Sequence, residues 1–345
     1  MSRRPTQKDV ADRAGVSRVT VSKVLNGATG GSVPISPETQ ARVLEAAHEL
    51  GYSPNPVAQM LKQGSNRLLG IFVYEPEFPY DVDNHLFHHL LGVQREASAL
   101  DYNIVSFTSN HNNGNPKIYD NGMNTIRLAD GCIIMGAMPD REELRNLASE
   151  SYPFVYVGRR EIEGHEIDWV TDDYAIGSGQ AVRHLIELGH RQIGFISGKF
   201  PPEATADKRE GCLKAIAQTE AHLIDIPALE DETPHDLMNA IQQHHITALI
   251  CTDQGNFHNT LQILVENNVR MPEDISLIAL TPPIRAMSMH LFPGVVSFVQ
   301  LDRSRVGKEA VRLLVHRLRN ETPAQNHIRV PCELVVGETT GPPRE

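Results

Sequence analysis

From Leu68 almost to the end of the chain, short apolar runs alternate with longer stretches whose apolar residues recur at helical spacing. The apolar runs have the length and composition of buried strands. A repeat of strand, helix and strand predicts parallel sheets, because a parallel crossover needs a connection long enough to hold a helix. We therefore expect an α/β fold over residues 67–345, with helices on both faces of the sheets.

The alternation contains more strands than one compact sheet ordinarily holds. The strand candidates are the apolar runs 68–73, 104–107, 131–135, 154–157, 192–196, 248–251, 276–280, 295–299 and 333–336. The helix candidates lie between them, near 85–100, 115–128, 140–150, 174–188, 204–218, 234–244, 256–268 and 302–319. The sequence therefore predicts two α/β subdomains with a cleft between them. Ligands in such folds bind beyond the carboxyl ends of the strands.

Before this alternation, residues 1–54 carry the signals of short helices. Thr6 followed by Asp9 predicts a capped first helix. Gly15 then supplies a tight turn, and Ser17 caps a second helix. A third helix is expected over residues 36–50. This order predicts a helix-turn-helix headpiece.

The second helix has two distinct faces. By helical spacing, the inner face holds Val16, Val21, Val24 and Leu25. The outer face holds Arg18, Val19, Ser22 and Lys23. Such an outer face is either an ordinary solvated surface or a surface that reads DNA bases, and the helix alone does not decide between them.

The distribution of charge favours DNA at this end of the chain. The net charge of the whole chain is −11, but residues 1–65 hold eight Lys or Arg against five acids, a balance of +3 that leaves −14 on the remainder. Positive charge is what the phosphates of nucleic acid attract. The opening helices are therefore the part of the chain that we expect to meet DNA.

Other classes of protein are disfavoured by the absence of their motifs. No apolar run approaches the ~20 residues of a membrane span, and no apolar segment of a secretory signal follows the charged N-terminus. We expect a cytoplasmic protein with no membrane partner. The four cysteines are scattered without C-x-x-C spacing, which predicts reduced, buried thiols. No dinucleotide fingerprint, P-loop or nucleophile elbow occurs, so we expect no enzyme activity and no cofactor.

Two further interpretations concern the ligand. His85, His88 and His89, near Asp81 and Asp83, have a spacing that would suit zinc on one helical face, and a metal-responsive regulator stays open as an alternative. A periplasmic sugar carrier would need an export signal, which the sequence does not show, and would leave the headpiece without a use.

The chain carries the motifs Asp9-Val-Ala, Ala14-Gly-Val-Ser with Thr20-Val-Ser22 and Val24-Leu-Asn26, Ser36-Pro-Glu-Thr, Leu50-Gly-Tyr-Ser-Pro-Asn55, and Leu188-Gly-His-Arg-Gln-Ile-Gly-Phe-Ile-Ser-Gly198. Together they resemble the LacI/GalR family of bacterial transcription regulators. The resemblance covers nearly the whole chain and implies a core like that of periplasmic binding proteins. It divides the chain into a headpiece 1–54, a hinge helix and linker 55–66, an N-subdomain 67–170 with 299–326, and a C-subdomain 171–298 with 327–345. The crossovers between the subdomains should fall near 171, 298 and 327.

The resemblance also implies a function. A homodimer would bind a pseudo-palindromic operator as a repressor, and a small molecule in the cleft, with a sugar or sugar derivative favoured, would alter the affinity for DNA. The sequence leaves the sign of that effect open. The implied DNA contacts are Arg18, Val19, Ser22 and Lys23 at base-facing positions, Thr6, Thr20, Asn26 and Asn55 at phosphates, and Ala58, Leu61 and Lys62 on the hinge. Leu61 matches the leucine that wedges between base steps.

In the cleft the sequence departs from the family pattern. Lys208 stands where the family has an arginine, Thr252-Asp253 where it has Asn-Asp, and Thr281 where it has an aspartate. Lysine does not reproduce the two-pronged hydrogen bonding of arginine. The candidate ligand-binding residues are Tyr74, Arg159, Lys208, Asp253, Thr281 and Gln300.

Overall fold

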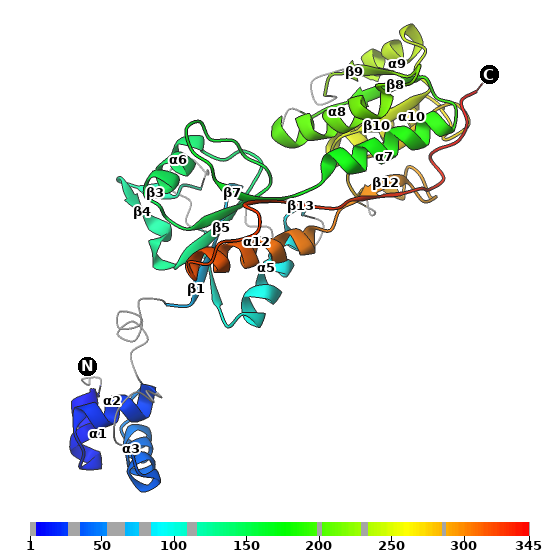
Figure 1. Cartoon of the computed structure of the whole chain (residues 1–345). Helices are drawn as coiled ribbons and strands as arrows, with labels where there is room; N and C mark the ends of the chain where they lie inside the picture. The colour runs from blue at the N-terminus through cyan, green and yellow to red at the C-terminus, as the bar shows by residue number, and fades with distance from the viewer. Residues whose placement is uncertain are drawn as a thin grey trace. The chain divides into compact units, whose positions relative to one another are not determined.

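A computed structural model of the chain describes residues 5–26, 35–53, 66–75, 84–108, 116–198, 202–228, 234–284 and 288–344. The chain divides into two compact units, Met1–Asn66 and Arg67–Glu345, which we call the headpiece and the core. Figure 1 shows helices in the headpiece and two sheets covered by helices in the core. Within the described part of the chain, no helix combines the length and apolar character that a membrane crossing requires.

The headpiece holds the helices α1 (Gln7–Ala14), α2 (Arg18–Asn26) and α3 (Pro37–Glu49), as the capping signals predict. Thr6 caps α1 in a capping box with Asp9, and Gly15 ends that helix with a φ of 64°. The three helices enclose a small core centred on Val10, Val21 and Val43, none of which is exposed.

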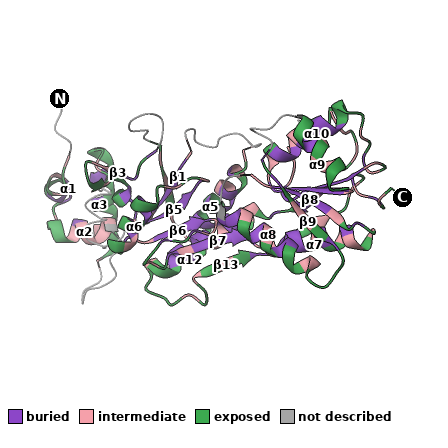
Figure 2. Ribbon diagram, turned by 90° about the horizontal axis from the view of Figure 1, so that it is seen from above, coloured by how far each residue is buried: buried purple, intermediate pink, exposed green. Residues whose placement is uncertain are grey.

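The first sheet of the core defines the N-subdomain, and its described strands are all parallel. In order across the sheet they are β13 (His327–Val330), β7 (Asp168–Asp172), β6 (Phe154–Val157), β5 (Gly131–Met135), β1 (Leu68–Val73) and β2 (Asn103–Phe107). The helices of this subdomain are α5 (Phe87–Ala99), α6 (Arg141–Ser149) and α12 (Arg303–Leu318). Figure 2 shows the buried strands at the centre and the exposed outer faces of the helices.

The second sheet defines the C-subdomain and is parallel except for β14, which runs antiparallel to β12. In order across the sheet the strands are β14 (Glu333–Val335), β12 (Ser297–Gln300), β11 (Ser276–Ala279), β10 (Ala248–Cys251), β8 (Gln192–Ile196) and β9 (His222–Ile226). Its helices are α7 (Tyr174–Glu187), α8 (Pro202–Ile216), α9 (Pro234–Gln243) and α10 (Gln254–Glu266).

The chain passes between the two subdomains after β7, after β12 and after β13. These passages lie a few residues later than the expected crossovers near 171, 298 and 327. One boundary needs correction, because residues 327–330 pair with β7 in the first sheet instead of joining the C-subdomain. Their alternating polar and apolar residues form an edge strand, whose polar side chains hid it among the loops.

Two other sequence expectations differ from the structure. Residues 115–128 were expected to form a helix, but the described part holds the hairpin strands β3 (Tyr119–Asp120) and β4 (Met123–Asn124), followed by the 3-10 helix η1 (Thr125–Leu128). Asn121 and Gly122 both have positive φ, which suits the tight turn of a hairpin. The strands β7 and β9 were not predicted, since their polar residues interrupt the apolar runs.

In each subdomain, one pair of helices packs so closely that the residue at the contact must be glycine. In the N-subdomain, α5 and α12 meet at Gly92 and Gly307, and a Cβ at Gly307 would overlap the carbonyl oxygen of His89. In the C-subdomain, α7 and α8 meet at Gly211, where a Cβ would overlap the carbonyl oxygen of Ala175. A backbone carbonyl cannot move out of the way of an added Cβ as a flexible side chain can. These glycines are therefore required for the close approach of the two helices.

We expect Gly307→Ala and Gly211→Ala each to lower the free energy of unfolding by about 1–3 kcal/mol, because the added methyl group must push two helices apart. Urea unfolding followed by circular dichroism measures the loss. Gly255→Ala is the matched control, since its Cβ would lie 3.4 Å from Asp253 Oδ1, an ordinary contact. If all three variants have the same free energy of unfolding, the close helix contacts do not require glycine and this explanation is wrong.

Candidate functional site

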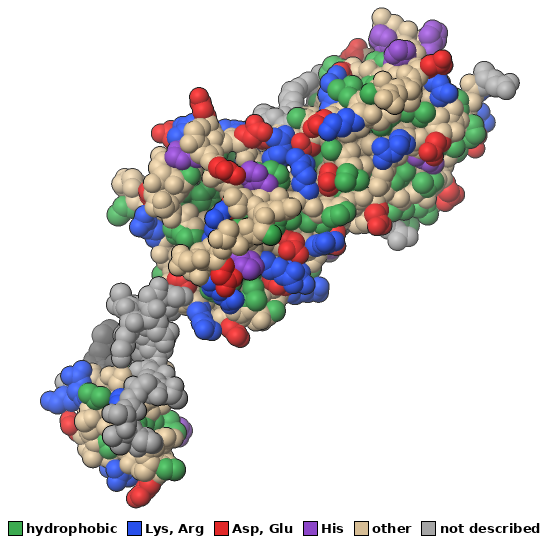
Figure 3. Space-filling model, in the orientation of Figure 1, with side chains coloured by type: hydrophobic (Ala, Val, Ile, Leu, Met, Phe, Trp, Pro, Cys, Tyr) green, Lys and Arg blue, Asp and Glu red, His purple; other side chains and the backbone are tan. Residues whose placement is uncertain are grey.

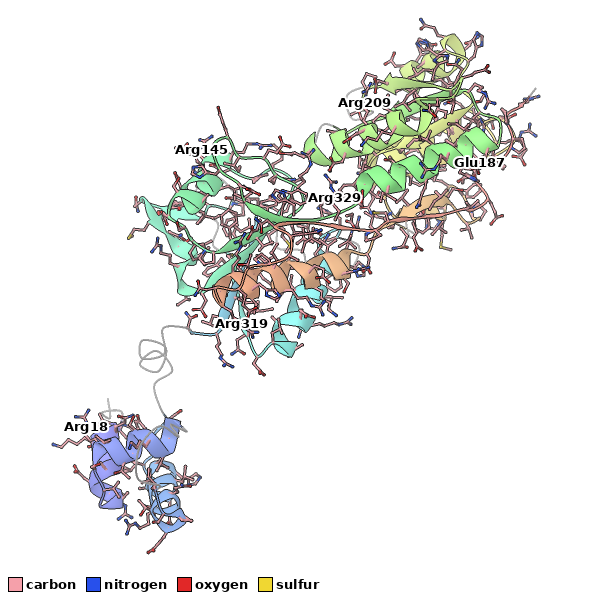
Figure 4. All side chains as sticks on the ribbon, viewed as in Figure 1. Arg18, Arg145, Glu187, Arg209, Arg319 and Arg329 are labelled. Carbon is pink, nitrogen blue, oxygen red and sulfur yellow. The ribbon has the colours of Figure 1, made fainter. Side chains whose placement is uncertain are left out.

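The outer face of α2 is the first candidate site. Arg18 and Val19 are exposed, and Val19 retains 65% of its accessible surface although it is apolar. Figure 4 shows Arg18 extending away from the helical bundle. Ser22 and Lys23 are half-buried, while Val16, Val24 and Leu25 pack against the headpiece core as helical spacing predicts. An exposed valine between basic residues suits a surface that meets base edges.

The threonines expected at phosphates lie at helix starts. Thr6 donates its hydroxyl to Asp9 in the cap of α1, and Thr20 pairs its hydroxyl with Ser17 at 2.9 Å at the start of α2. Backbone N–H groups at such helix starts attract anions. Of the other expected contacts, Asn26 ends α2, whereas Asn55, Ala58, Leu61 and Lys62 lie outside the described residues.

The second candidate site is a cavity of about 320 Å³ in the core, lined by residues of both subdomains. Its walls come from segments that follow the carboxyl ends of parallel strands in both sheets, as the fold class predicts. The volume lies at the lower end of the range for small-molecule sites.

The structure brings four of the six expected ligand-binding residues to this cavity, namely Arg159, Lys208, Asp253 and Thr281. Tyr74 is not among the lining residues, because its side chain turns into the N-subdomain core and donates to Glu143 at 2.9 Å. Gln300 is also absent from the lining, and its exposed amide donates to the carbonyl of Leu301. A strand-end position does not fix the direction of the side chain.

Three of these four residues already have protein partners. Arg159 pairs with Asp207 and Glu161. Asp253 caps α10 by accepting from the backbone N–H of Asn256 at 2.9 Å. The ammonium group of Lys208 donates to the carbonyl of Thr252 at 2.6 Å and lies 4.6 Å from the centre of the Tyr174 ring.

The groups without partners were mostly missed by sequence reasoning. Buried side-chain atoms of the cavity that lack a hydrogen-bond partner among the described residues are Asp172 Oδ1, Thr281 Oγ1, His89 Nδ1 and Arg160 Nε. Asp172 was overlooked because it ends a strand that was not recognised. Arg303, which begins α12 and also lines the cavity, resembled an ordinary helix-start residue.

Burial changes the protonation of these groups. Burial raises the pKa of Asp172 to about 6, against the opposing charges of Arg303 and Lys208. Burial also lowers the pKa of Lys208 to about 8. The pKa of His89 falls to about 3 through burial and then through the charge of Arg303, so its ring is neutral at pH 7. Charge is expensive in this cavity unless a ligand compensates it.

A second set of charges joins the two subdomains at α8. Glu203 and Asp207, both buried, face arginines of the N-subdomain. The pairs are Arg141–Glu203 at 2.5 Å, Arg159–Asp207 at 3.0 Å, Arg329–Asp207 at 3.3 Å and the longer Arg160–Glu203 contact at 3.9 Å. We call this set the α8 ion-pair cluster. Figure 4 shows Arg329 where the chain passes from one subdomain to the other.

The histidines do not form a zinc site with other described residues. His85 precedes α5 and is not part of that helix, although both His85 and His89 line the core cavity. Across the residues that the structure describes, no three His, Cys, Asp or Glu side chains gather as a metal ion requires. Asp81 and Asp83 lie outside those residues.

Comparison with known proteins identifies the two units. Residues 6–55 match the bacterial regulatory proteins of the lacI family, and residues 182–340 match a periplasmic binding protein-like domain. The HTH-type transcriptional repressor PurR of Pasteurella multocida (strain Pm70) is 31% identical over 96% of this chain and 97% of its own length. The chain belongs to the lacI family of bacterial regulatory proteins. The family and the fold expected from the sequence are thereby confirmed.

Solved structures agree with this assignment. A complex of the transcriptional regulator CelR with cellobiose is 26% identical, with a TM-score of 0.60, and covers 97% of this chain and 100% of its own. The lac repressor dimer bound to operator and the anti-inducer ONPF shares the fold at 20% identity, with a TM-score of 0.72 and coverage of 98% and 100%. A member of this family is a DNA-binding transcription regulator, which fits the exposed face of α2.

The buried carboxyl group of Asp172 makes a testable contribution to stability. Because folding raises its pKa from 3.8 to about 6, its charged form opposes folding. The penalty is absent below the unfolded value, grows as the pH rises, and is complete above the folded value. Asp172→Asn should therefore stabilise the protein by about 1–3 kcal/mol at pH 7.5, with a smaller gain at pH 4.5.

Urea unfolding at the two pH values measures this difference. The exposed Asp101→Asn is the isosteric control and should change stability little at either pH. A gain for Asp172→Asn that does not depend on pH would contradict the assignment of the penalty to ionisation.

The α8 ion-pair cluster yields a second prediction for this site. Asp207→Asn leaves Arg329 without its carboxylate and Arg159 with only the exposed Glu161, and should destabilise the core by about 1–3 kcal/mol. Asp225→Asn breaks an exposed pair with Arg209, labelled in Figure 4, and should cost less than about 1 kcal/mol. Urea unfolding measures the free energy of unfolding of both variants. Equal losses would show that the α8 ion-pair cluster contributes no more to stability than an exposed ion pair.

Proposed function

We propose that this protein is a repressor that binds a pseudo-palindromic operator as a homodimer, and that a carbohydrate-like ligand in the core cavity sets its affinity for DNA. The cavity carries the proposal, because both subdomains line it and three chain passages connect them. A ligand that contacts both subdomains favours one arrangement of them over another, and so shifts the population competent to bind DNA.

The proposed DNA contacts follow the exposed face of α2. Arg18, Val19, Ser22 and Lys23 would meet base edges, and Thr6, Thr20, Asn26 and Asn55 would meet phosphates. On the hinge, Leu61 would wedge between base steps in the minor groove, with Ala58 one helical turn before it, and Lys62 would reach a phosphate. The charge distribution supports this arrangement, because on the face of the core seen in Figure 3 acidic and basic side chains are interspersed, which gives no single basic surface there.

The carbohydrate-like ligand is supported by one solved relative and by the lining of the cavity. CelR has been solved with cellobiose and is similar over nearly the whole chain. The cavity combines apolar walls, including Leu86, Val157 and Val306, with unpartnered polar atoms. Apolar walls with a few polar groups are typical of sites that bind a small molecule. We propose binding without chemical conversion, as the family consists of regulators.

The DNA contacts are tested by selecting bound sequences from a random pool and then measuring fluorescence anisotropy. Wild-type protein should select inverted half-sites. Lys23→Ala should lose about 1–3 kcal/mol of preference at one base pair of each half-site, because a side chain that reads a base edge is gone. Arg42→Ala, which removes the same charge from an exposed position on α3, should leave the base preference unchanged.

The proposal fails if the pool yields no preferred sequence. The assignment of Lys23 fails separately if its variant weakens binding to every sequence by the same factor, which is the behaviour of a phosphate contact.

A further inference from the structure

We propose that the ligand of the cavity is an anionic carbohydrate, a sugar bearing a carboxylate or phosphate group, whose acid group binds Arg303 and whose hydroxyl groups bind Asp172. This inference rests on the proposed function, since it specifies the ligand of the same cavity. It follows from which polar groups around the cavity are already engaged and which are not.

Arg303 is the cation available to a ligand. It lines the cavity at the first turn of α12, and its guanidinium forms no hydrogen bond or ion pair with any residue that the structure describes. The other two arginines of the lining are engaged, Arg159 by Asp207 and Arg160 by the carbonyl of Gly136 at 2.9 Å. A planar guanidinium presents its donors as a fork that matches a carboxylate or a phosphate.

The described acids near the cavity form no hydrogen bond or ion pair with this guanidinium. Asp173, Asp253 and Asp302 each accept a backbone N–H at the start of a helix and are used as caps. Asp172 is the remaining carboxylate of the lining. Against it stand Arg303 and Lys208, whose ammonium group donates to a carbonyl and not to an acid. The capping acids keep their negative charge, but among the lining residues the four cations Arg159, Arg160, Lys208 and Arg303 outnumber the two acids Asp172 and Asp253. An anionic ligand would compensate this excess of positive charge.

Asp172 indicates that the ligand also carries hydroxyl groups. It ends β7 with 2% of its surface exposed, and its Oδ1 has no partner among the described residues. A carboxylate accepts hydrogen bonds, so it needs a donor such as a sugar hydroxyl. Thr281 Oγ1 and the neutral ring of His89 add two groups that exchange hydrogen bonds with hydroxyls. A simple inorganic anion would leave these atoms unsatisfied and would meet Asp172 as a like charge.

A neutral sugar and an amino sugar fit less well. A neutral sugar would satisfy Asp172 but would offer the donors of Arg303 no charged acceptor in a partly buried site. An amino sugar would add a second cation beside Arg303 and Lys208. The test should therefore compare sugars that share the same ring but carry a negative, neutral or positive group.

Calorimetric titration of the full-length protein provides the test. D-glucuronate is compared with the neutral D-glucose and the amine D-glucosamine, and D-galacturonate is compared with the neutral D-galactose. D-glucose 6-phosphate, compared with D-glucose, tests a phosphate as the acid group. At least one acid should bind about tenfold or more tightly than its neutral partner, as expected for a hydrogen bond to a charged group. Whether a carboxylate or the phosphate binds best distinguishes the two acid groups.

Two variants locate the effect. Arg303→Gln should reduce the preference for the acid to about twofold or less, whereas Arg305→Gln, an exposed position on the same helix, should retain it. The inference is overturned if the neutral sugar or the amine binds as tightly as the acid, if the acid preference survives Arg303→Gln, or if no acid binds at millimolar concentration.

Anisotropy with the selected operator separates this inference from the proposed function. An acid that binds through Arg303 without changing the affinity for DNA would refute the proposed regulation and leave the ligand class standing. A neutral sugar that changes the affinity for DNA, while the acids do not bind, would refute the anionic ligand class and leave the proposed regulation standing.

Discussion

Two buried carboxylates on α8, Glu203 and Asp207, hold the subdomains in the arrangement that forms the cavity. They are four residues apart and therefore lie on one face of the helix. Their arginine partners come from α6, from the segment after β6 and from β13, which are separate parts of the N-subdomain. A buried charge that loses its partner is strongly destabilising, so these pairs resist any movement of α8 that separates them.

The same helix also reaches the ligand cavity. Lys208 follows Asp207 directly, so consecutive residues of α8 contact the opposite subdomain and line the cavity. A ligand that changes the position of this turn must also change the geometry of the α8 ion-pair cluster. Coupling between the cavity and the subdomain arrangement then requires no long chain of intermediate contacts.

The buried polar atoms without hydrogen-bond partners in the described part of the chain are concentrated at the cavity, where they would lower stability but can bind a ligand. Of the six such buried side-chain atoms among the described residues, four belong to residues that line the cavity and one, Glu203 Oε2, belongs to the α8 ion-pair cluster. A chain optimised for stability alone would fill these positions with apolar groups or pair them. Their concentration at one place is what a site that receives polar ligand groups requires.

Much of the fold could be predicted because its signals are local. The caps of α1 and α3 and the apolar runs of the central strands each lie within a few residues of sequence. β7, β9 and β13 could not be recognised in that way, because strands at or near a sheet edge keep polar side chains that resemble loop residues. In the cavity, a strand-end position predicted Tyr74 as a lining residue but could not predict the direction of its side chain, which turns into the N-subdomain core. Arg303 became a candidate only when the engaged partners of the other arginines were known.

Asp172 and Arg303 also lie on the passages between the subdomains. Asp172 is the last residue before the chain crosses to α7, and Arg303 is the first helical residue after it returns from β12. A rotation of one subdomain against the other must be absorbed by the backbone of these short passages. A ligand held by both residues would bind next to these passages, so it would restrict the backbone that must move when one subdomain rotates against the other. We infer that the position of these two residues, and not only their charges, makes the cavity suited to regulation.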